Sequence, residues 1–238
     1  MRRIIFWGFI FVLFSAFVFG AELERYSGQS EDDGQEATSG AVNTSFTYVE
    51  LVVKFERWGG AYRFPNATIP QDATINSAYL SLHVYAGDYI HSIDSIACEN
   101  VDSATIISGG PGNEYNISNR WNNRTDAAIL WQEDVRPSGR DSTPDLGSLV
   151  QEIVNRPNWK SGNAIIFLFK CAVIDNDSSA YETYSWDTDP NSVYGAILHV
   201  NYTPSSTPND PPIVSDIRDS TITEGETFDQ INLDDYVT

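Results

Sequence analysis

An alternation of apolar and polar side chains with a period of two is the feature that most constrains how this chain can fold. Over residues 75–85, apolar side chains take every second position from Ala78 to Val84. Successive side chains of a strand point to opposite faces, so the pattern predicts a strand with one face in a core and one toward solvent. Residues 194–202 alternate in the same way. Residues 163–170 are continuously apolar, which is typical of a strand buried on both faces.

Two further strands and one helix complete the expected architecture. Strands are expected at residues 47–56 and 61–64, the second after a turn at Gly59-Gly60. A helix is expected over residues 143–155, because apolar side chains recur there at i, i+3, i+4 and i+7 (Leu146, Leu149, Val150, Ile153). The pattern predicts an all-β fold, a jelly-roll-type β-sandwich with one short amphipathic helix.

Residues near both ends of this segment are of types favoured at helix termini. Thr143 is expected to cap its N-terminus, Pro144 to take the first helical position and Asp145 to lie at the positive end of the helix dipole. Pro157 is expected to stop it.

The chain is expected to be exported and to hold more than one domain. Arg2 and Arg3 precede an apolar run of 16 residues, which indicates a secretory signal over residues 1–20. An uncleaved anchor helix is the alternative, but the run is shorter than the roughly 20 residues that span a bilayer. We therefore expect a secreted or cell-surface protein that does not insert into the membrane after cleavage. The other expected parts are a polar leader (21–28), the sandwich (29–203), a linker with four prolines (204–212) and an incomplete second β domain (213–238).

Charge excludes two classes of partner. The chain has 33 acidic and 14 basic residues, a formal net charge of -19. Nucleic acid binding needs clustered Lys and Arg, so nucleic acid is not an expected partner. Adhesion to anionic lipid is disfavoured for the same reason.

Two kinds of covalent modification fit an exported chain. Cys98 and Cys171 are the only thiols, and we leave two alternatives open: a disulfide between them, or two separate core thiols. Six Asn-X-Ser/Thr triplets are candidate glycosylation acceptors, at Asn43, Asn66, Asn116, Asn123, Asn176 and Asn201.

Several segments carry a resemblance to a known family. They are Arg63–Leu80, Asn116–Arg120, Thr125–Trp131, Val150–Ala164, Ser185–Asp187 and Ala196–Tyr202, with Asp32-Asp33 and Glu36 ahead of them. Over about residues 29–203 the chain resembles the DNRLRE domain group, a β-sandwich module of large secreted prokaryotic proteins related to carbohydrate-binding jelly rolls. Residues 209–237 are similar to the first strands of a cadherin-like or Ig-like repeat. The resemblance implies the N-terminal part of a multidomain surface protein and identifies architecture rather than activity.

Aromatic side chains outside the expected core are candidates for sugar binding, because their faces stack on pyranose rings. Trp131 and Trp159 lie beside apolar runs and are expected in the core. The candidates are Trp58, Trp121, Tyr184 and Trp186, with the last two expected on one strand face at i, i+2. The alternative is that these rings also pack in the interior.

Acidic clusters offer oxygen ligands for calcium. Asp32, Asp33 and Glu36 are expected to meet Asp187 and Asp189, since the first and last strands of a sandwich are often neighbours. The resemblance to jelly rolls also implies a structural calcium between terminal segments. The alternative is a solvated acidic turn.

No motif in the sequence points to catalysis. The three histidines are scattered, and nothing resembles a nucleophile elbow, a zinc helix or a phosphate loop. We therefore expect a non-catalytic extracellular module for adhesion or polysaccharide attachment, with polysaccharide or other surface proteins as partners. The alternatives are a structural subunit of a surface fibre, and an ancillary domain of a secreted hydrolase.

Overall fold

A computed structural model describes residues 20–52, 57–87, 92–133, 139–174, 181–188 and 194–205. The chain divides into two units, Met1–Ser205 and Ser206–Thr238, and all described residues belong to the first. The expected signal segment and second β domain therefore fall on residues outside this description, apart from Gly20.

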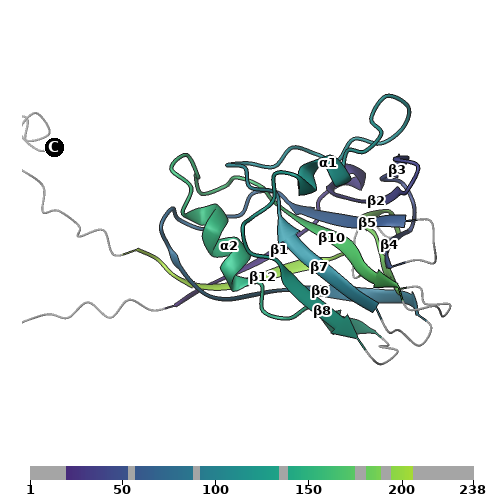
Figure 1. Ribbon diagram of the computed structural model, residues 1–238. Coiled ribbons are helices and arrows are strands. Elements are labelled where there is room, and N and C mark those ends of the chain that lie inside the picture. The colour runs from purple at the N-terminus through teal and green to yellow at the C-terminus, as the bar shows by residue number, and fades with distance from the viewer. Residues whose placement is uncertain are drawn as a thin grey trace, which may run out of the picture. The chain divides into compact units, whose positions relative to one another are not determined.

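The described residues form two β-sheets in which every pairing is antiparallel (Figure 1). The first sheet has the order β1 (Ala21–Tyr26), β12 (Ile197–Thr203), β6 (Thr74–Gly87), β11 (Tyr181–Tyr184), β4 (Tyr48–Val52), and β9 (Arg140–Ser142) also pairs with β6. The second has the order β3 (Val42–Asn43), β2 (Asp33–Ala37), β5 (Arg57–Phe64), β10 (Ile165–Ile174), β7 (Ser92–Cys98), β8 (Ile129–Glu133). The prediction of an all-β sandwich is confirmed.

The period-two prediction holds along β6. Its even-numbered side chains from Ala78 to Val84 are buried, while Tyr79, His83 and Tyr85 on the alternate positions keep solvent contact. Residues Ile165 to Phe169 of β10 are buried on both faces of the strand, as their continuous apolar run predicts. One of its faces joins the core between the sheets, and the other packs under the segment that holds Ile107, Ile117 and Trp121.

The expected polar leader is wrong, because residues 21–26 form strand β1. This strand pairs with β12 along its whole length, from Ala21 opposite Tyr202 to Tyr26 opposite Ile197. Leu23 points into the core, while Glu22 and Glu24 are exposed. Leu23, the partly buried Ala21 and a full ladder of backbone hydrogen bonds are enough to hold an edge strand that looks polar in sequence.

The expected turn at Gly59-Gly60 is also wrong, because both glycines lie inside β5. A Cβ on Gly59 would lie 1.8 Å from the carbonyl oxygen of Phe169 on β10. A Cβ on Gly60 would lie 2.6 Å from Cγ1 of Val49 on β4. The glycines therefore permit close approach of neighbouring strands rather than a reversal of the chain.

The expected helix is present as α2 (Gly147–Val154), but it begins later than predicted. Its apolar stripe of Leu149, Val150 and Ile153 is buried against the core, with Leu146 just before it. Thr143 does not cap the helix, because its Oγ1 accepts a hydrogen bond from the Leu80 N–H at 3.0 Å. The segment before α2 instead serves as a hydrogen-bonding partner of β6.

Asp145 links that segment to the helix. Its Oδ1 accepts from the N–H groups of Ala78 and Gly147, each at 2.9 Å. A second short helix, α1 (Ser118–Trp121), was not predicted; it packs over the second sheet, and its start lies against Glu36 of β2 (Figure 1).

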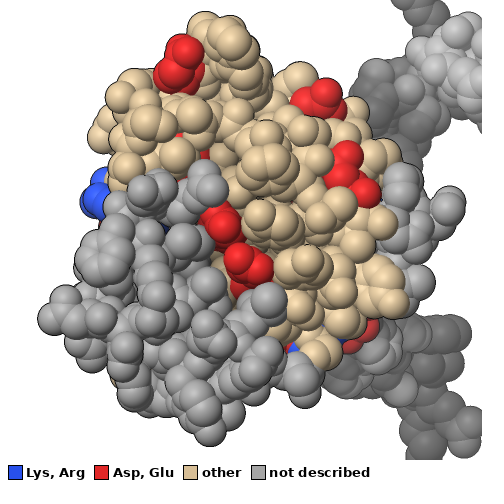
Figure 2. Space-filling model, turned by 90° about the vertical axis from the view of Figure 1, so that its right-hand side faces the viewer, with Lys and Arg blue, Asp and Glu red and all other residues tan. Residues whose placement is uncertain are grey.

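The surface retains the acidic character of the composition. On the face drawn in Figure 2, carboxylate side chains lie across the described surface, and Lys and Arg are confined to its margin. Three carboxylates of the described residues form ion pairs with arginine: Arg63–Asp32, Arg120–Glu99 and Arg156–Asp102.

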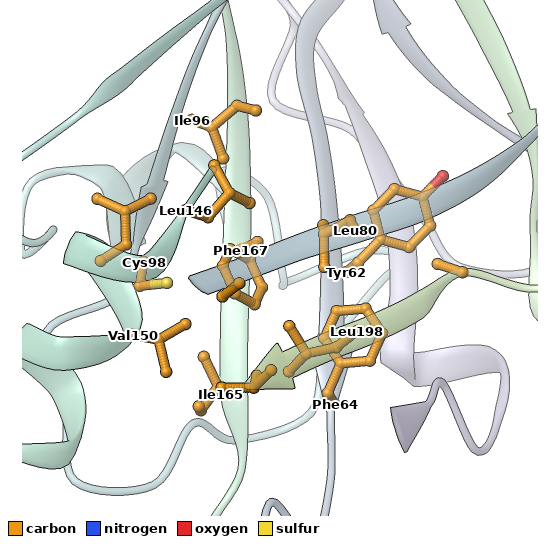
Figure 3. Packing of buried hydrophobic residues seen from close by; sticks show 14 of the residues in the cluster. Tyr62, Phe64, Leu80, Ile96, Cys98, Leu146, Val150, Ile165, Phe167 and Leu198 are labelled. Atoms are coloured by element: carbon orange, nitrogen blue, oxygen red, sulfur yellow. The ribbon is translucent and has the colours of Figure 1, made fainter. Parts of the chain in front are cut away.

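The core between the sheets is built from large side chains of both sheets and of α2 (Figure 3). Phe167 of β10 lies among residues from β5, β6 and the α2 segment, and Phe64 meets it edge to face with ring centroids 5.9 Å apart. Trp131 and Trp159 are 4% and 1% exposed, so their predicted core positions are confirmed. The indole N–H of Trp159 donates to the Ile69 carbonyl at 2.9 Å, so this buried polar group is paired.

Cys98 is a buried free thiol, and the predicted alternative of a Cys98–Cys171 disulfide is wrong. The β7–β10 register places Cys98 opposite Phe167 and Cys171 opposite Asp94. The two cysteines are therefore offset by four residues, about 13 Å along the strands, beyond the Cα separation of about 4–7 Å that a disulfide allows. Burial raises the pKa of the Cys98 thiol well above its ordinary value, and the charge of Glu152 adds to this.

Candidate functional site

The outer face of the first sheet carries a row of aromatic rings in mutual contact. His83 and Tyr85 occupy outward positions of β6, because the alternate positions are in the core. Tyr184 of β11 lies directly opposite Tyr48 of β4 in the register of the sheet. We call the following set the aromatic face: Phe46, Tyr48, His83, Tyr85, Tyr184 and Tyr194.

Ring contacts run through the whole set. Phe46 stacks on Tyr48 with ring centroids 5.8 Å apart, and Tyr48 stacks on Tyr85 at 5.3 Å and 12° between planes. Tyr85 meets Tyr184 edge to face at 5.1 Å. Tyr194 completes the set, 4.9 Å from Tyr184 and 4.8 Å from His83. All these separations fall in the range of attractive aromatic pairs, so the rings hold one another in place as a platform.

The platform leaves ring surface open to solvent. Phe46 is 40%, Tyr85 47% and Tyr194 38% exposed. Cross-strand aromatic pairs can stabilise a sheet by roughly 0.2–1 kcal/mol each, which would explain the contacts but not the exposure. A concentration of exposed aromatic surface on one side of a monomer is typical of a binding site. The polar edges of His83 and the tyrosines supply hydrogen-bonding groups around that surface.

Of the four predicted sugar-binding aromatics, only Tyr184 lies in this platform. Trp186 does not share a strand face with Tyr184, because β11 ends at Tyr184 and Trp186 begins the 3-10 turn η2 (Trp186–Thr188). Trp121 is 8% exposed and packs in the second core cluster, beneath the cations of Arg124 and Lys170. This burial favours the alternative reading, in which the ring packs in the interior, over a role in sugar binding. The side chain of Trp58 lies outside the described residues.

Sequence reasoning missed five of the six rings. The signal available for β6 was that its outward positions carry Tyr79, His83 and Tyr85, where a solvated strand face usually carries charged or small polar side chains. No comparable signal existed for Tyr48 or Tyr194, because their proximity to β6 depends on strand pairing across long stretches of sequence.

The predicted calcium ligands are brought together only in part. Asp33 opens β2, and its Oδ2 accepts a hydrogen bond from the Trp186 N–H at 2.8 Å. This places Asp33 beside Asp187, whose Oδ1 accepts from the Ser30 hydroxyl at 2.7 Å. The other oxygens, Oδ1 of Asp33 and Oδ2 of Asp187, are buried and have no hydrogen-bond partner. Asp189 lies outside the described residues.

The other two predicted ligands have different partners. Asp32 pairs with Arg63 through one oxygen and accepts from the Gly28 N–H at 2.9 Å through the other. Glu36 Oε2 accepts from the N–H groups of Ile117 and Ser118, at 2.8 and 2.9 Å, at the start of α1. Among the described residues no group of three or more His, Cys, Asp or Glu side chains is arranged to hold a metal ion.

Burial strongly perturbs Asp33, which is only 1% exposed. Desolvation raises the pKa of its carboxyl well above the ordinary value, the hydrogen bond from Trp186 lowers it, and the charges of Asp187 and Asp32 raise it further. An unpaired carboxylate oxygen in such a position carries a large desolvation cost. A cation at this point would remove that cost.

The predicted glycosylation acceptors differ in accessibility. Asn66 and Asn123 are exposed; Asn43, Asn116 and Asn201 are half-buried. The side-chain oxygen of Asn116 accepts hydrogen bonds from the Ser108 N–H and the Arg120 guanidinium. Asn176 lies outside the described residues.

Comparisons with known proteins add no family assignment: no protein-family model matches the chain, and neither does any curated protein. The resemblance to DNRLRE and cadherin-like modules therefore stays a prediction. Within the described part of the chain, no helix has the length and apolar character needed to cross a bilayer.

Proposed function

We propose that this chain is a non-catalytic extracellular module that attaches its parent protein to polysaccharide through the aromatic face. The observation that carries the proposal is the set of six contacting rings on one side of the sheet, three of them 38–47% exposed. Aromatic faces stack on the apolar faces of sugar rings, and surrounding hydroxyl and imidazole groups bond sugar hydroxyls. The acidic surface favours neutral or cationic glycans over anionic ones.

Two alternative functions are a structural subunit of a surface fibre and an ancillary domain beside a hydrolase. A structural subunit of a surface fibre would need a protein partner to cover the exposed rings. An ancillary role beside a hydrolase is compatible with the proposal, since sugar binding would then serve a catalytic domain elsewhere. The expected secretion supports both versions.

A glycan array with matched variants tests the proposal. Tyr85→Ala removes a ring from the aromatic face, while Tyr115→Ala removes an equally exposed tyrosine (47% for both) from another part of the surface. We expect at least one glycan to bind the parent protein and to bind Tyr85→Ala about tenfold more weakly, a loss of about 1.4 kcal/mol. Tyr115→Ala should bind as the parent does. A parent protein that binds no glycan, or equal losses in the two variants, would exclude the proposal.

We further propose that Asp33 and Asp187 hold a structural calcium ion. The supporting observation is the pair of buried carboxylate oxygens without partners, one of them on a residue that is 1% exposed. Calcium prefers carboxylate and carbonyl oxygens and tolerates irregular geometry. The ion would join the start of β2 to the turn after β11, two segments far apart in sequence.

Thermal unfolding in calcium and in chelator tests this second proposal. Saturating calcium should raise the melting temperature of the parent by about 5–10 °C, because a ligand that binds only the folded state stabilises it. Asp33→Asn should abolish the rise, and Asp126→Asn, an exposed aspartate on another loop, should retain it. An unchanged melting temperature in the parent, or a full rise in Asp33→Asn, would contradict the assignment.

A further inference from the structure

A groove of about 290 Å³ lies on the first sheet, where β1, β12 and β6 are neighbours. Its lining includes Glu22 and Glu24 of β1, Tyr79 of β6, and His199 and Asn201 of β12. None of these residues belongs to the aromatic face.

Two rings form a flat element of this groove. Tyr79 and His199 are direct partners in the β6–β12 register. Their rings are stacked, with centroids 4.6 Å apart and planes at 14°. Tyr79 is 38% exposed, so the pair retains an open surface on which a further ring can lie.

Acidic side chains flank the stacked pair. Glu22 and Glu24 are both exposed, and a Glu24 carboxylate oxygen lies 3.3 Å from Nδ1 of His199. Burial lowers the pKa of His199 below its ordinary value; Glu24 and Glu22 oppose this and Arg140 adds to it. His199 is therefore mainly neutral at pH 7, and the two carboxylates are not cancelled by an imidazolium.

Arg140 brings one positive charge near His199, against the two negative charges of Glu22 and Glu24. The Arg140 guanidinium donates to the carbonyl oxygens of Ser81 and Gly195, at 3.1 and 3.2 Å. The groove thus combines a flat aromatic surface with a local excess of negative charge, which suits a ring-shaped ligand that carries a positive charge.

The groove and the aromatic face share one strand. Tyr79 and Tyr85 both occupy outward positions of β6 and are six residues apart, about 20 Å along the strand. Both sites therefore lie on the same side of the sheet, and a single extended chain can reach both.

We propose that this groove is a second sugar subsite, and that the ligand is a linear chain of amino sugars with free ammonium groups bound lengthwise along β6. This inference rests on the proposed polysaccharide function and specifies its substrate class. The aromatic face supplies stacking, while Glu22 and Glu24 select for the ammonium group over its acetylated form.

Calorimetric titration with two hexasaccharides tests the inference, one of glucosamine and one of N-acetylglucosamine. The parent should bind the free-amine chain at least tenfold more tightly. A Glu22→Gln/Glu24→Gln double variant should lose about tenfold in affinity for the free-amine chain and little for the acetylated one. Glu114→Gln, an exposed glutamate elsewhere, is the matched control and should change neither.

Tyr79→Ala tests the length of the site. It should weaken the glucosamine hexasaccharide, which can reach both subsites, about tenfold, and Tyr85→Ala should weaken it as well. If Tyr85→Ala weakens binding while Tyr79→Ala and the double variant do not, the groove is excluded and the polysaccharide function stands. If the parent binds no glycan of any class, both are excluded. Equal affinity of the parent for the two hexasaccharides overturns the amino-sugar class.

Discussion

At the scale of single residues, Asp33 shows how strongly burial in the fold changes the environment and the pKa of a carboxyl group. In sequence it is one acid among 33. In the fold it is buried, one oxygen bonds the Trp186 N–H, and the other has no partner. Its charge also reaches Tyr62, whose pKa is raised first by burial and then by Asp33.

The raised pKa of Asp33 predicts a pH-dependent effect of its replacement. Between the ordinary value of 3.8 and the higher folded value, the folded state binds more protons than the unfolded state, so this group costs stability as pH rises through that window. In chelator at pH 7, Asp33→Asn should therefore be more stable than the parent by roughly 1–3 kcal/mol. Denaturant titrations should show the difference shrinking as pH falls toward 3.8. A difference that does not vary with pH would show that the effect is not electrostatic; Asp126→Asn serves as the reference.

At the scale of elements, strand β5 depends on how closely its neighbours approach. The glycines that look like a turn in sequence lie where β5 meets β10 and β4. Periodicity locates strands from side chains, but glycine has none, so a strand with central glycines cannot be recognised by this signal. Helix α2 begins at Gly147 rather than at the predicted residue 143, because Thr143 and Asp145 accept hydrogen bonds from β6. These contacts between distant segments override the local capping pattern.

Two glycine substitutions distinguish two causes of instability: steric contact with a neighbouring strand, and strain from a positive φ. Gly59→Ala would place a Cβ 1.8 Å from the Phe169 carbonyl oxygen, whereas a Cβ on Gly110 would have no atom within 4 Å. Both glycines have positive φ, +155° and +80°. Gly59→Ala should cost about 4 kcal/mol or more, or prevent folding, and Gly110→Ala only about 1–2 kcal/mol. Similar losses in urea unfolding would show that backbone strain, not the contact with β10, sets the requirement.

At the scale of the whole molecule, the two outer faces of the sandwich carry different kinds of side chain. The inner faces and α2 form the core, and the outer face of the second sheet is covered by its own apolar cluster around Ile166 and Leu168. The outer face of the first sheet carries the aromatic face and the acidic groove instead. The net charge of -19 is unfavourable for anionic partners, in agreement with the neutral or cationic glycans proposed above.

The sequence by itself determined which strands have an inner and an outer face, that β10 is buried on both, and that α2 packs through one stripe. Those features follow from local periodicity, because burying the apolar side of an element contributes more to its stability than any other interaction. Only the tertiary structure decided which outward rings meet and which buried acids are left unpaired. Tyr48, Tyr85 and Tyr184 come from three strands, and Asp33 meets Asp187 across most of the chain. Such meetings depend on strand order and register, which arise from backbone hydrogen bonds between distant segments and leave no periodic signal in the sequence.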